Sequence, residues 1–233
     1  MISFVIPAHN EEKLLSRTLD ALHRAARKTG QDYEMIVVDD ASTDATATIA
    51  SRCGARVVSV DRRQIAAVRN EGAKRVEGDP IIFVDADTVV PSQTLRAALQ
   101  ALDDGAVGGG VVVGFDEELA FWGRFLLGLW NTISRWRCWA AGCFIFVRRS
   151  VFEAVGGFDE QYFVGEEIFL SKAIQTRGRF VILRDSVLSS ARKTKSHSAW
   201  ETAKVIARLL LLGRKAWQKR EGLDMWYVRR DEK

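Results

Sequence analysis

The stretch that decides the fold is Ile81-Ile82-Phe83-Val84-Asp85-Ala86-Asp87. Four consecutive apolar residues predict a buried strand, and two carboxylates separated by one residue follow directly at its exit. In an open α/β sheet, ligands bind beyond the carboxyl ends of the strands, where Asp85 and Asp87 are expected to lie. Carboxylate oxygens of this kind suit Mg²⁺ or Mn²⁺, which usually also bind nucleotide phosphates. The alternative is a pair of turn aspartates that cap the helix expected after Pro91.

Short β-rich runs alternate with helical segments on the N-terminal side of this stretch. The runs span residues 2–6, 35–38, 56–60 and 81–84. One face of the first intervening helix is marked by Leu14, Leu15, Leu19, Leu22 and Ala26. Strands that are apolar along their whole length indicate a parallel sheet covered by helices on both faces. The expected fold class is therefore α/β, with a Rossmann-like and mostly parallel sheet.

Length and composition fit one folded domain with an elaboration. The 233 residues are 47% hydrophobic and 27% charged, which is ordinary for a globular protein with a substantial core. Three irregularly spaced cysteines indicate neither a disulfide framework nor a zinc site, so the cytoplasm is the expected location. Met1 opens directly onto a strand, and the apolar stretches at residues 119–130 and 205–212 are too short to span a bilayer. We therefore expect neither a signal peptide nor a membrane-crossing segment.

The second half of the sequence has a different character. All seven tryptophans lie after residue 120. Two glycine-bearing strands, at residues 107–114 and 142–147, bracket an aromatic, arginine-dotted helical segment at residues 117–138. Residues 192–233 hold twelve Lys/Arg against five Asp/Glu, a surplus of +7, whereas the whole chain has a net charge of +4. The tail is therefore basic and the body slightly acidic.

Polar residues collect at the ends of the first strands of the expected sheet. Pro7-Ala8-His9-Asn10-Glu11 follows the first strand, at a junction whose free N–H groups suit polar ligand atoms, and Glu11 is a candidate acceptor for ribose hydroxyls. Asp39 and Asp40 end the second strand, and one of them is a candidate acceptor for the imide N–H of a uracil. Helix capping is the alternative for each motif. Like charges at one edge repel unless a cation compensates, and Arg69 is expected to do so and to approach a diphosphate.

The order and wording of these motifs resemble the family 2 glycosyltransferases, which have the GT-A fold. The matching stretches are SFVIPAHNEE (3–12), VVDDASTD (37–44), RNEGA (69–73), FVDAD (83–87), GGFDE (156–160) and GEEIFL (165–170). The resemblance implies a GT-A domain over residues 1–185, with a nucleotide-binding half (1–100) and an acceptor half (101–185). A basic helical extension, residues 186–233, is expected to pack on the same domain.

The resemblance also implies the reaction. It is an inverting transfer of a sugar from a UDP- or GDP-linked donor to an acceptor hydroxyl, with Mn²⁺ or Mg²⁺. The Gln-x-x-Arg-Trp motif of processive polysaccharide synthases is absent, so a single addition is expected. By the same resemblance, the nucleoside and diphosphate pocket is lined by Pro7, His9, Glu11, Asp40, Arg69 and Asp85. The metal is assigned to Asp87 and Asp85.

Glu167 is the general base that the resemblance implies. Glu166-Glu167 stands where the family usually has Glu-Asp, and Phe169 stands where it often has a second acid. Helical spacing after Gly165 places the pair in the first turn of a helix, where the dipole favours ionised carboxylates. A near-normal pKa, about 4.3 for an unperturbed glutamate, is therefore expected at Glu167. Glu166 is a candidate contact to the acceptor or the diphosphate.

The basic tail offers further candidates. Arg192 and Lys193 are candidates to close over the diphosphate, and a solvated basic stretch is the alternative. His197 is a candidate third metal ligand or, alternatively, a surface histidine. The helical spacing of residues 200–217 indicates a helix packed on its own domain, or an interfacial helix that meets anionic lipid. The second interpretation suits a lipid-linked acceptor and peripheral contact with the membrane.

Two other functions are compatible with parts of the pattern. A sugar-1-phosphate nucleotidyltransferase also uses a nucleotide-binding α/β sheet, but no Gly-rich phosphate loop opens this chain after its first strand. A catalytically inactive nucleotide-sugar sensor fits the Glu166-Glu167 pair and Phe169, and donor turnover separates it from an enzyme. Nucleic-acid binding is not expected, because the aromatic residues of the tail follow helix packing rather than a stacking surface.

Overall fold

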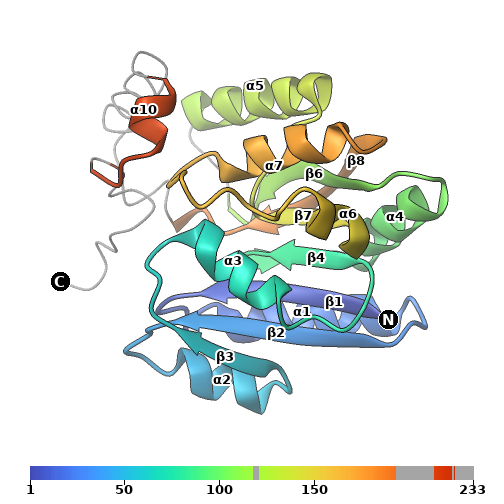
Figure 1. The fold of residues 1–233 in the computed structure, drawn as a ribbon. Coiled ribbons are helices and arrows are strands. Elements are labelled where there is room, and N and C mark those ends of the chain that lie inside the picture. The colour runs from blue at the N-terminus through green and yellow to red at the C-terminus, as the bar shows by residue number, and fades with distance from the viewer. Residues whose placement is uncertain (118–120, 193–212, 222, 224–233) are drawn as a thin grey trace.

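The computed structural model describes residues 1–117, 121–192, 213–221 and 223. Its strands, in chain order, are β1 (Ile2–Ala8), β2 (Tyr33–Asp40), β3 (Arg56–Val60), β4 (Ile81–Val84), β5 (Thr88–Val89), β6 (Gly108–Phe115), β7 (Phe144–Val147) and β8 (Phe180–Ser189). Its helices are α1 (Leu15–Arg27), α2 (Thr46–Arg52), α3 (Ile65–Ala73), α4 (Ser92–Asp103), α5 (Phe121–Arg137), α6 (Arg149–Ala154), α7 (Glu166–Gln175) and α10 (Arg214–Trp217). Figure 1 shows their arrangement around one sheet.

Within the described residues, eight strands form this sheet in the order β3-β2-β1-β4-β7-β6-β8-β5. β1 runs parallel to both β2 and β4, and β2 runs parallel to β3. β7 is antiparallel to β4 and β6, β5 is antiparallel to β8, and β6 and β8 are parallel. The N-terminal half is therefore the parallel α/β unit that the sequence predicts, and the C-terminal half adds antiparallel pairs.

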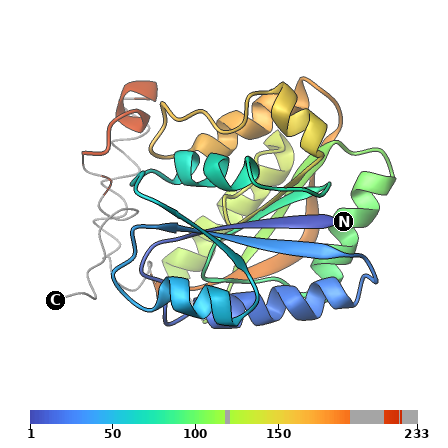
Figure 2. The same cartoon turned by 60° about the horizontal axis from the view of Figure 1, so that its bottom comes forward.

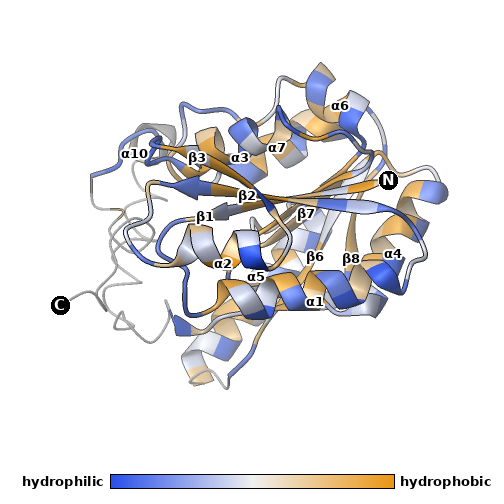
Figure 3. Ribbon diagram, turned by 90° about the horizontal axis from the view of Figure 1, so that it is seen from below, coloured by the Kyte–Doolittle hydropathy of each residue, from blue (hydrophilic) through white to orange (hydrophobic). Residues whose placement is uncertain are grey.

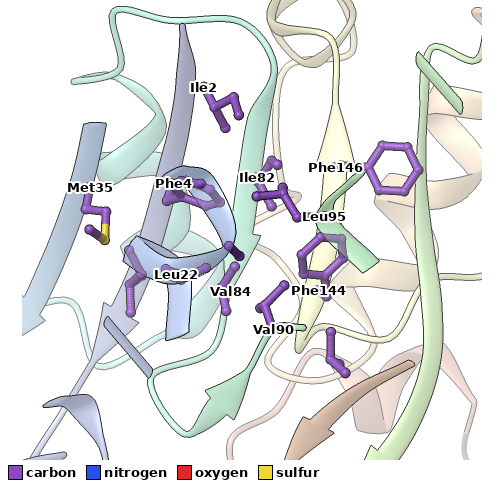
Figure 4. Close-up of a cluster of buried hydrophobic side chains, with 14 of the residues drawn as sticks. Ile2, Phe4, Leu22, Met35, Ile82, Val84, Val90, Leu95, Phe144 and Phe146 are labelled. Atoms are coloured by element: carbon purple, nitrogen blue, oxygen red, sulfur yellow. The ribbon is translucent and has the colours of Figure 1, made fainter. Parts of the chain in front are cut away.

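Helices cover both faces of the sheet, so the central strands contribute to two cores. Figure 2 shows α1 and α2 below the sheet and α3, α6 and α7 above it. The core under α1 and α4 contains Ile2, Phe4, Ile82, Val84, Phe144 and Phe146 (Figure 4). The core under α3 and α6 contains their strand neighbours Val5, Ile81, Phe83, Ile145 and Val147. This alternation explains why the central strands carry apolar residues on both faces.

The packing of α1 follows its sequence pattern. Leu15, Leu19, Leu22 and Ala26 are buried, as the predicted apolar face requires. Figure 3 shows that α1 carries hydrophilic and hydrophobic stripes, whereas the strands that it covers are hydrophobic along most of their length. α1 thus covers apolar side chains on one face of the sheet that would otherwise be exposed to water.

The C-terminal strand differs from the expected division of the chain. β8 pairs with β6 from Gly108↔Phe180 to Phe115↔Ser189, so the boundary expected after residue 185 falls inside a strand. Residues 186–189 therefore complete the sheet instead of beginning a helical extension. No helix in the described part of the chain is both long enough and apolar enough to cross a membrane.

Candidate functional site

Three neighbouring strands deliver the candidate donor-binding residues to one edge of the sheet. β1, β2 and β4 are parallel, so their carboxyl ends lie side by side. We call this region the acidic edge and define it as residues 7–12, 39–44 and 85–87. It is the position at which open α/β sheets bind their ligands.

His9 ties the end of β1 to the end of β2. Its Nδ1 donates to the carbonyl oxygen of Asp40 at 2.7 Å, and its Nε2 accepts from Nη1 of Arg63 at 3.1 Å. A carbonyl group only accepts and a guanidinium only donates, so this pattern assigns a neutral ring with its proton on Nδ1. His9 is thus fixed at the place where the nucleoside pocket is expected, next to the half-buried Pro7 of β1.

The two aspartates that end β2 have different environments. The carboxylate of Asp40 accepts the backbone N–H groups of Arg62 at 2.6 Å and of Arg63 at 2.9 Å. Asp39 is 6% exposed, and its Oδ1 has no hydrogen-bond partner within the described residues. A buried acceptor without a donor is unfavourable by about 1–3 kcal/mol, which a bound N–H group would relieve. Asp40, the expected nucleoside contact, therefore shapes a loop, whereas Asp39 retains an unused acceptor.

The side chain of Asn10, in the loop after β1, does not cap a helix. α1 is preceded by Leu14, which makes no side-chain cap. Asn10 instead accepts the backbone N–H of Thr43 at 2.7 Å, and the backbone N–H of Glu11 donates to Oγ1 of Thr46 at 2.7 Å. These bonds link the loop after β1 to the loop after β2. Asn10 therefore links two loops of the acidic edge to each other, and the helix-capping role considered for its motif does not apply to it.

Arg192 reaches the acidic edge from the far end of the sequence. β5 pairs with β8 so that Thr88 lies opposite Ser189, which brings the chain after β8 beside the exit of β4. Nη2 of Arg192 donates to both carboxylate oxygens of Glu11, at 2.9 and 3.2 Å. Two residues expected in one pocket are thus in contact. The other tail candidates, which lie outside the described residues, are Lys193 and His197.

The exit of β4 carries the two carboxylates of the predicted metal site. Oδ1 of Asp85 accepts from Arg69 at 2.8 Å, and the backbone oxygen of Asp85 accepts the N–H of Thr88 at 3.0 Å. Among the described residues, no group of three or more His, Cys, Asp or Glu is placed to hold a metal ion. Mg²⁺ in nucleotide sites is commonly bound by one or two carboxylates, with phosphates and water completing the shell. Asp85 and Asp87 therefore fit a cation that binds together with a nucleotide.

Arg69 on α3 connects the acidic edge to α7. Its side chain is 1% exposed, and it donates to Asp85 at 2.8 Å, to the carbonyl of Gly142 at 2.9 Å and to Glu166 at 2.7 Å. Burial alone would lower the pKa of Arg69, but the carboxylates of Asp85 and Glu166 outweigh burial and raise it. The expected compensation of the acidic strand end is present. The expected contact with a diphosphate needs an open position, whereas Arg69 is a buried cross-link.

The Glu166-Glu167 pair occupies the first turn of α7, as the sequence predicts. Glu166 is buried against Arg69, and Glu167 keeps part of its surface exposed. Burial and the charge of Glu166 raise the pKa of Glu167 well above its usual range. This corrects the expectation of a near-normal carboxyl, because these two effects outweigh the helix dipole. Once ionised, Glu167 is accordingly a stronger base than an exposed glutamate.

Aromatic side chains surround Phe169, which stands one turn after Glu166. Its ring stacks on Tyr162 with centroids 3.9 Å apart and meets Trp217 of α10 edge-on at 5.8 Å. Gly165 has φ 73°, and a Cβ there would lie 2.7 Å from the ring of Trp217, so both the backbone and the space require glycine. Trp217 therefore closes the turn that leads into the glutamate pair, a role that its sequence context does not indicate.

Asn70 joins two motifs that are far apart in the sequence. Its Nδ2 donates to the carbonyl of Phe158 and to Oε1 of Glu160, both at 2.9 Å. Its Oδ1 accepts the N–H of Phe158 at 2.9 Å, and the neighbouring Arg69 lies 5.2 Å from the ring of Phe158. Asn70 was not among the expected site residues. The available signal was its position directly after Arg69 in a matched motif.

Comparisons with known proteins identify the family of the chain. Residues 3–156 match the family described as glycosyl transferase family 2, and the chain belongs to this family. It is 36% identical over 112 residues to the undecaprenyl-phosphate 4-deoxy-4-formamido-L-arabinose transferase of Edwardsiella ictaluri. That match covers 45% of this chain and 34% of the relative, so the chain spans about a third of the relative's length.

Solved structures establish the fold class. TarS residues 1–349 of Staphylococcus aureus, in complex with UDP-GlcNAc, superposes with a TM-score of 0.64 at 17% identity and covers 96% of this chain and 69% of that chain. The mannosyltransferase PcManGT of Pyrobaculum calidifontis, in complex with GDP-Man and Mn²⁺, gives a TM-score of 0.67 at 21% identity and covers 93% and 66%. The predicted GT-A fold is confirmed.

Proposed function

We propose that this protein is an inverting, non-processive glycosyltransferase that moves one sugar from a nucleoside diphosphate sugar to an acceptor hydroxyl. The observation that carries the proposal is the bridge from Asp85 through Arg69 to Glu166. It joins an acidic strand end suited to phosphate and metal with a glutamate pair suited to proton transfer. Family membership and the fold shared with TarS and PcManGT support the same class of donor.

The donor is assigned to the acidic edge. Asp39 offers its unused oxygen to an N–H of the base, and Glu11 lies at the end of β1 as an acceptor for ribose hydroxyls. Asp85 and Asp87 would hold Mn²⁺ or Mg²⁺, which when bound neutralises charge on the diphosphate. Within this proposal, residues 1–100 bind the donor and the acceptor half begins after them.

The acceptor hydroxyl is assigned to the side of Glu167. The ionised carboxylate takes the hydroxyl proton while the oxygen attacks the anomeric carbon from the side opposite the diphosphate. The bond from that carbon to the diphosphate breaks as the new bond forms, which inverts the configuration. The raised pKa of Glu167 supports the role, because a base acts best when its pKa lies near the working pH. Arg69 holds Glu166 in place and leaves Glu167 to face the substrate.

The acceptor that we propose is a lipid-linked molecule that presents a free hydroxyl group to Glu167. The relative from Edwardsiella ictaluri is named for undecaprenyl phosphate, and its match covers 45% of this chain. A lipid-linked acceptor places the reaction at the cytoplasmic face of a membrane, where the protein binds peripherally. The three cysteines are free thiols, which agrees with a reducing compartment.

The proposal is tested by measuring donor binding and donor turnover on the same protein. UDP- and GDP-sugars should raise the melting temperature more with Mn²⁺ than with chelator, because a ligand that binds the native state stabilises it. Donor turnover should disappear with chelator and return with Mn²⁺ or Mg²⁺. Asp87→Ala should abolish it, whereas Asp20→Ala on the exposed side of α1 serves as the matched control. Full turnover by Asp87→Ala in chelator refutes the metal role, and binding without turnover identifies a nucleotide-sugar sensor instead.

A further inference from the structure

The helix α5 turns its apolar face away from the protein. Among the described residues, six of the seven exposed large hydrophobic side chains lie on this helix. They are Phe121 (87% exposed), Trp122, Phe125 (66%), Leu126, Leu129 and Trp136 (76%). Ser134 is the one residue of the helix that is buried. A contiguous apolar patch of this kind marks a contact surface.

Hydrogen bonds hold the inner side of α5 to the sheet and to the segment that follows the helix. Oδ1 of Asn131 accepts the backbone N–H of Val113 at 3.1 Å, and Nδ2 of Asn131 donates to the carbonyl of Val113 at 3.0 Å. Oγ of Ser134 donates to the carbonyl of Trp139 at 2.6 Å. Because successive helical residues are about 100° apart, Asn131 and Ser134 lie opposite the middle of the apolar arc. α5 therefore turns its polar side to the protein and its apolar side outward, whereas the leucines of α1 face the core.

Arginines lie along both edges of this apolar arc. The helix contains three arginines and no acidic residue. The arc spans about 140° of the helical wheel, with Arg124 and Arg135 along one edge and Arg137 along the other. Arg137 also lies over the ring of Trp136, 4.6 Å from its centroid. Aromatic and aliphatic side chains between arginines are the pattern of a helix that lies in the headgroup region of an anionic membrane.

We propose that the outward face of α5 is a membrane-docking surface that binds anionic lipid. The arginines attract the lipid phosphates, and the phenylalanine, tryptophan and leucine side chains enter the headgroup layer. The commitment to lipid rests on charge complementarity and on the aromatic character of the face. The surface itself does not depend on the reaction that we assign to the acidic edge.

The C-terminal end of α5 is attached to the helix that carries the glutamate pair. Gln175 of α7 donates to the carbonyl of Cys138 at 2.8 Å, and Oγ of Ser171 accepts the N–H of Ala140 at 3.0 Å. The same Oγ donates to the carbonyl of Glu167 at 2.7 Å. Docking through α5 therefore holds the first turn of α7 in a fixed relation to the bilayer. The consequence, which rests on the proposed function, is that a lipid-linked acceptor reaches Glu167 from the membrane.

Co-sedimentation of the full chain with vesicles tests the surface directly. Vesicles of phosphatidylcholine and phosphatidylglycerol in equal parts should bind the protein, and vesicles of phosphatidylcholine alone should bind it much less. Salt should weaken binding, because charges are screened within about 8–10 Å at physiological ionic strength. The triple variant Phe121→Ser, Phe125→Ser, Trp136→Ser should partition at least about tenfold less, a change of about 1.4 kcal/mol.

A second pair of variants tests whether vesicle binding depends on the arginines of α5 or only on the net charge of the protein. Replacing Arg124, Arg135 and Arg137 by glutamine should lower binding to anionic vesicles by about tenfold or more, since arginines near such a surface are attracted to the lipid phosphates. The matched control replaces Arg24, Arg27 and Arg52, which lie on α1 and α2, by glutamine. It removes the same net charge from another surface and should bind like the unaltered protein. Equal loss in both variants would overturn the assignment to α5.

Other occupants of the face give distinct results, and each would overturn the proposal. A homodimer in light scattering that the serine variant abolishes, without vesicle binding, assigns the face to a second copy. A lowered melting temperature of the serine variant, without vesicle binding, assigns it to residues 193–212 of the same chain. Donor turnover in solution should be unchanged in all these variants. Turnover without vesicle binding would overturn this inference and the peripheral membrane contact, but it would leave the proposed sugar transfer intact. Vesicle binding without turnover would overturn the proposed sugar transfer and leave the docking surface intact.

Discussion

The acidic edge and the first turn of α7 both gather carboxylates, but their charges are balanced in different ways. At the acidic edge, Asp40 accepts backbone N–H groups and Glu11 pairs with Arg192, so these two acids have separate donors. In α7, two neighbouring glutamates depend on the same buried guanidinium, and Glu166 makes the hydrogen bond to it. Glu167 is left with a raised pKa. The hydrogen-bond and charge partners of a glutamate therefore decide how easily its carboxyl group gives up its proton.

The largest expected effect concerns the division of labour within α7. Glu167→Gln should lower sugar transfer by about 10²–10⁴-fold, because that is the usual contribution of a general base. Nucleotide affinity should change little, since the acidic edge is untouched. Transfer rates at saturating donor, with nucleotide affinity from calorimetry, check both parts. Glu166→Gln is the matched variant and should impair transfer less. Normal transfer by Glu167→Gln together with loss in Glu166→Gln would shift the base by one residue.

The next effect concerns the guanidinium that both regions share. Arg69→Gln should lower the free energy of unfolding by about 3–5 kcal/mol, because it leaves the buried Glu166 and the partly buried Asp85 without their cation. Urea denaturation measures this change. Arg24→Gln, at an exposed position on α1, should stay within about 0.5 kcal/mol of the unaltered protein. A loss as small for Arg69→Gln as for Arg24→Gln would mean that the two acidic regions are stabilised independently.

A smaller effect separates the two aspartates of β2. Asp40→Ala should destabilise the fold by about 1–3 kcal/mol, because the N–H groups of Arg62 and Arg63 lose their acceptor. Asp39→Asn should leave stability unchanged or raised, since it removes a buried charge with an unpartnered oxygen. It should nevertheless weaken nucleotide binding by roughly tenfold, as expected for one hydrogen bond to a charged group. Thermal unfolding and nucleotide titration of both variants decide the matter. If Asp40→Ala weakens nucleotide binding and Asp39→Asn does not, Asp40 is the residue that contacts the nucleoside.

The smallest effect is the pH dependence of stability that Glu167 confers. Its pKa is raised in the folded protein by burial and by Glu166, so folding favours the protonated form. This contribution is fully present below the unfolded pKa of about 4.3 and is lost as the pH rises through the folded pKa. Glu167→Gln should therefore raise the melting temperature at neutral pH and do so less near about pH 4. A gain that is the same at both pH values would contradict the raised pKa.

The parallel half of the fold was predictable because its signals are local. Apolar runs of strand length, with polar residues at each exit, fix where β1, β2 and β4 lie and which ends carry the ligands. Asp85-Ala86-Asp87 falls at the end of β4 for this reason alone. Helical spacing after Gly165 likewise predicted that Glu166 and Glu167 lie in the first turn of α7, where the structure has them. The choice of Glu167 as the base comes from the family resemblance and stays a prediction.

The partners of these residues were not predictable, because they are set by tertiary contacts. Arg69 and Glu166 are 97 positions apart, and Glu11 and Arg192 are 181 apart. Arg69 was expected to compensate the acidic strand ends, and it pairs with Asp85, but its burial and its second bond to Glu166 have no signal in the sequence. The raised pKa of Glu167 likewise follows from desolvation, which has no signal in the sequence.

The three hydrogen bonds of Asn70 make the two halves of the chain interdependent. Asn70 belongs to the half assigned to the donor, whereas Phe158 and Glu160 belong to the half assigned to the acceptor. Exchange of the whole acceptor half between family members, by natural recombination or in a chimera, would separate these partners unless both parents carry matching residues. New acceptor preferences should therefore evolve more readily by remodelling the segment between β6 and β7 than by shuffling entire halves.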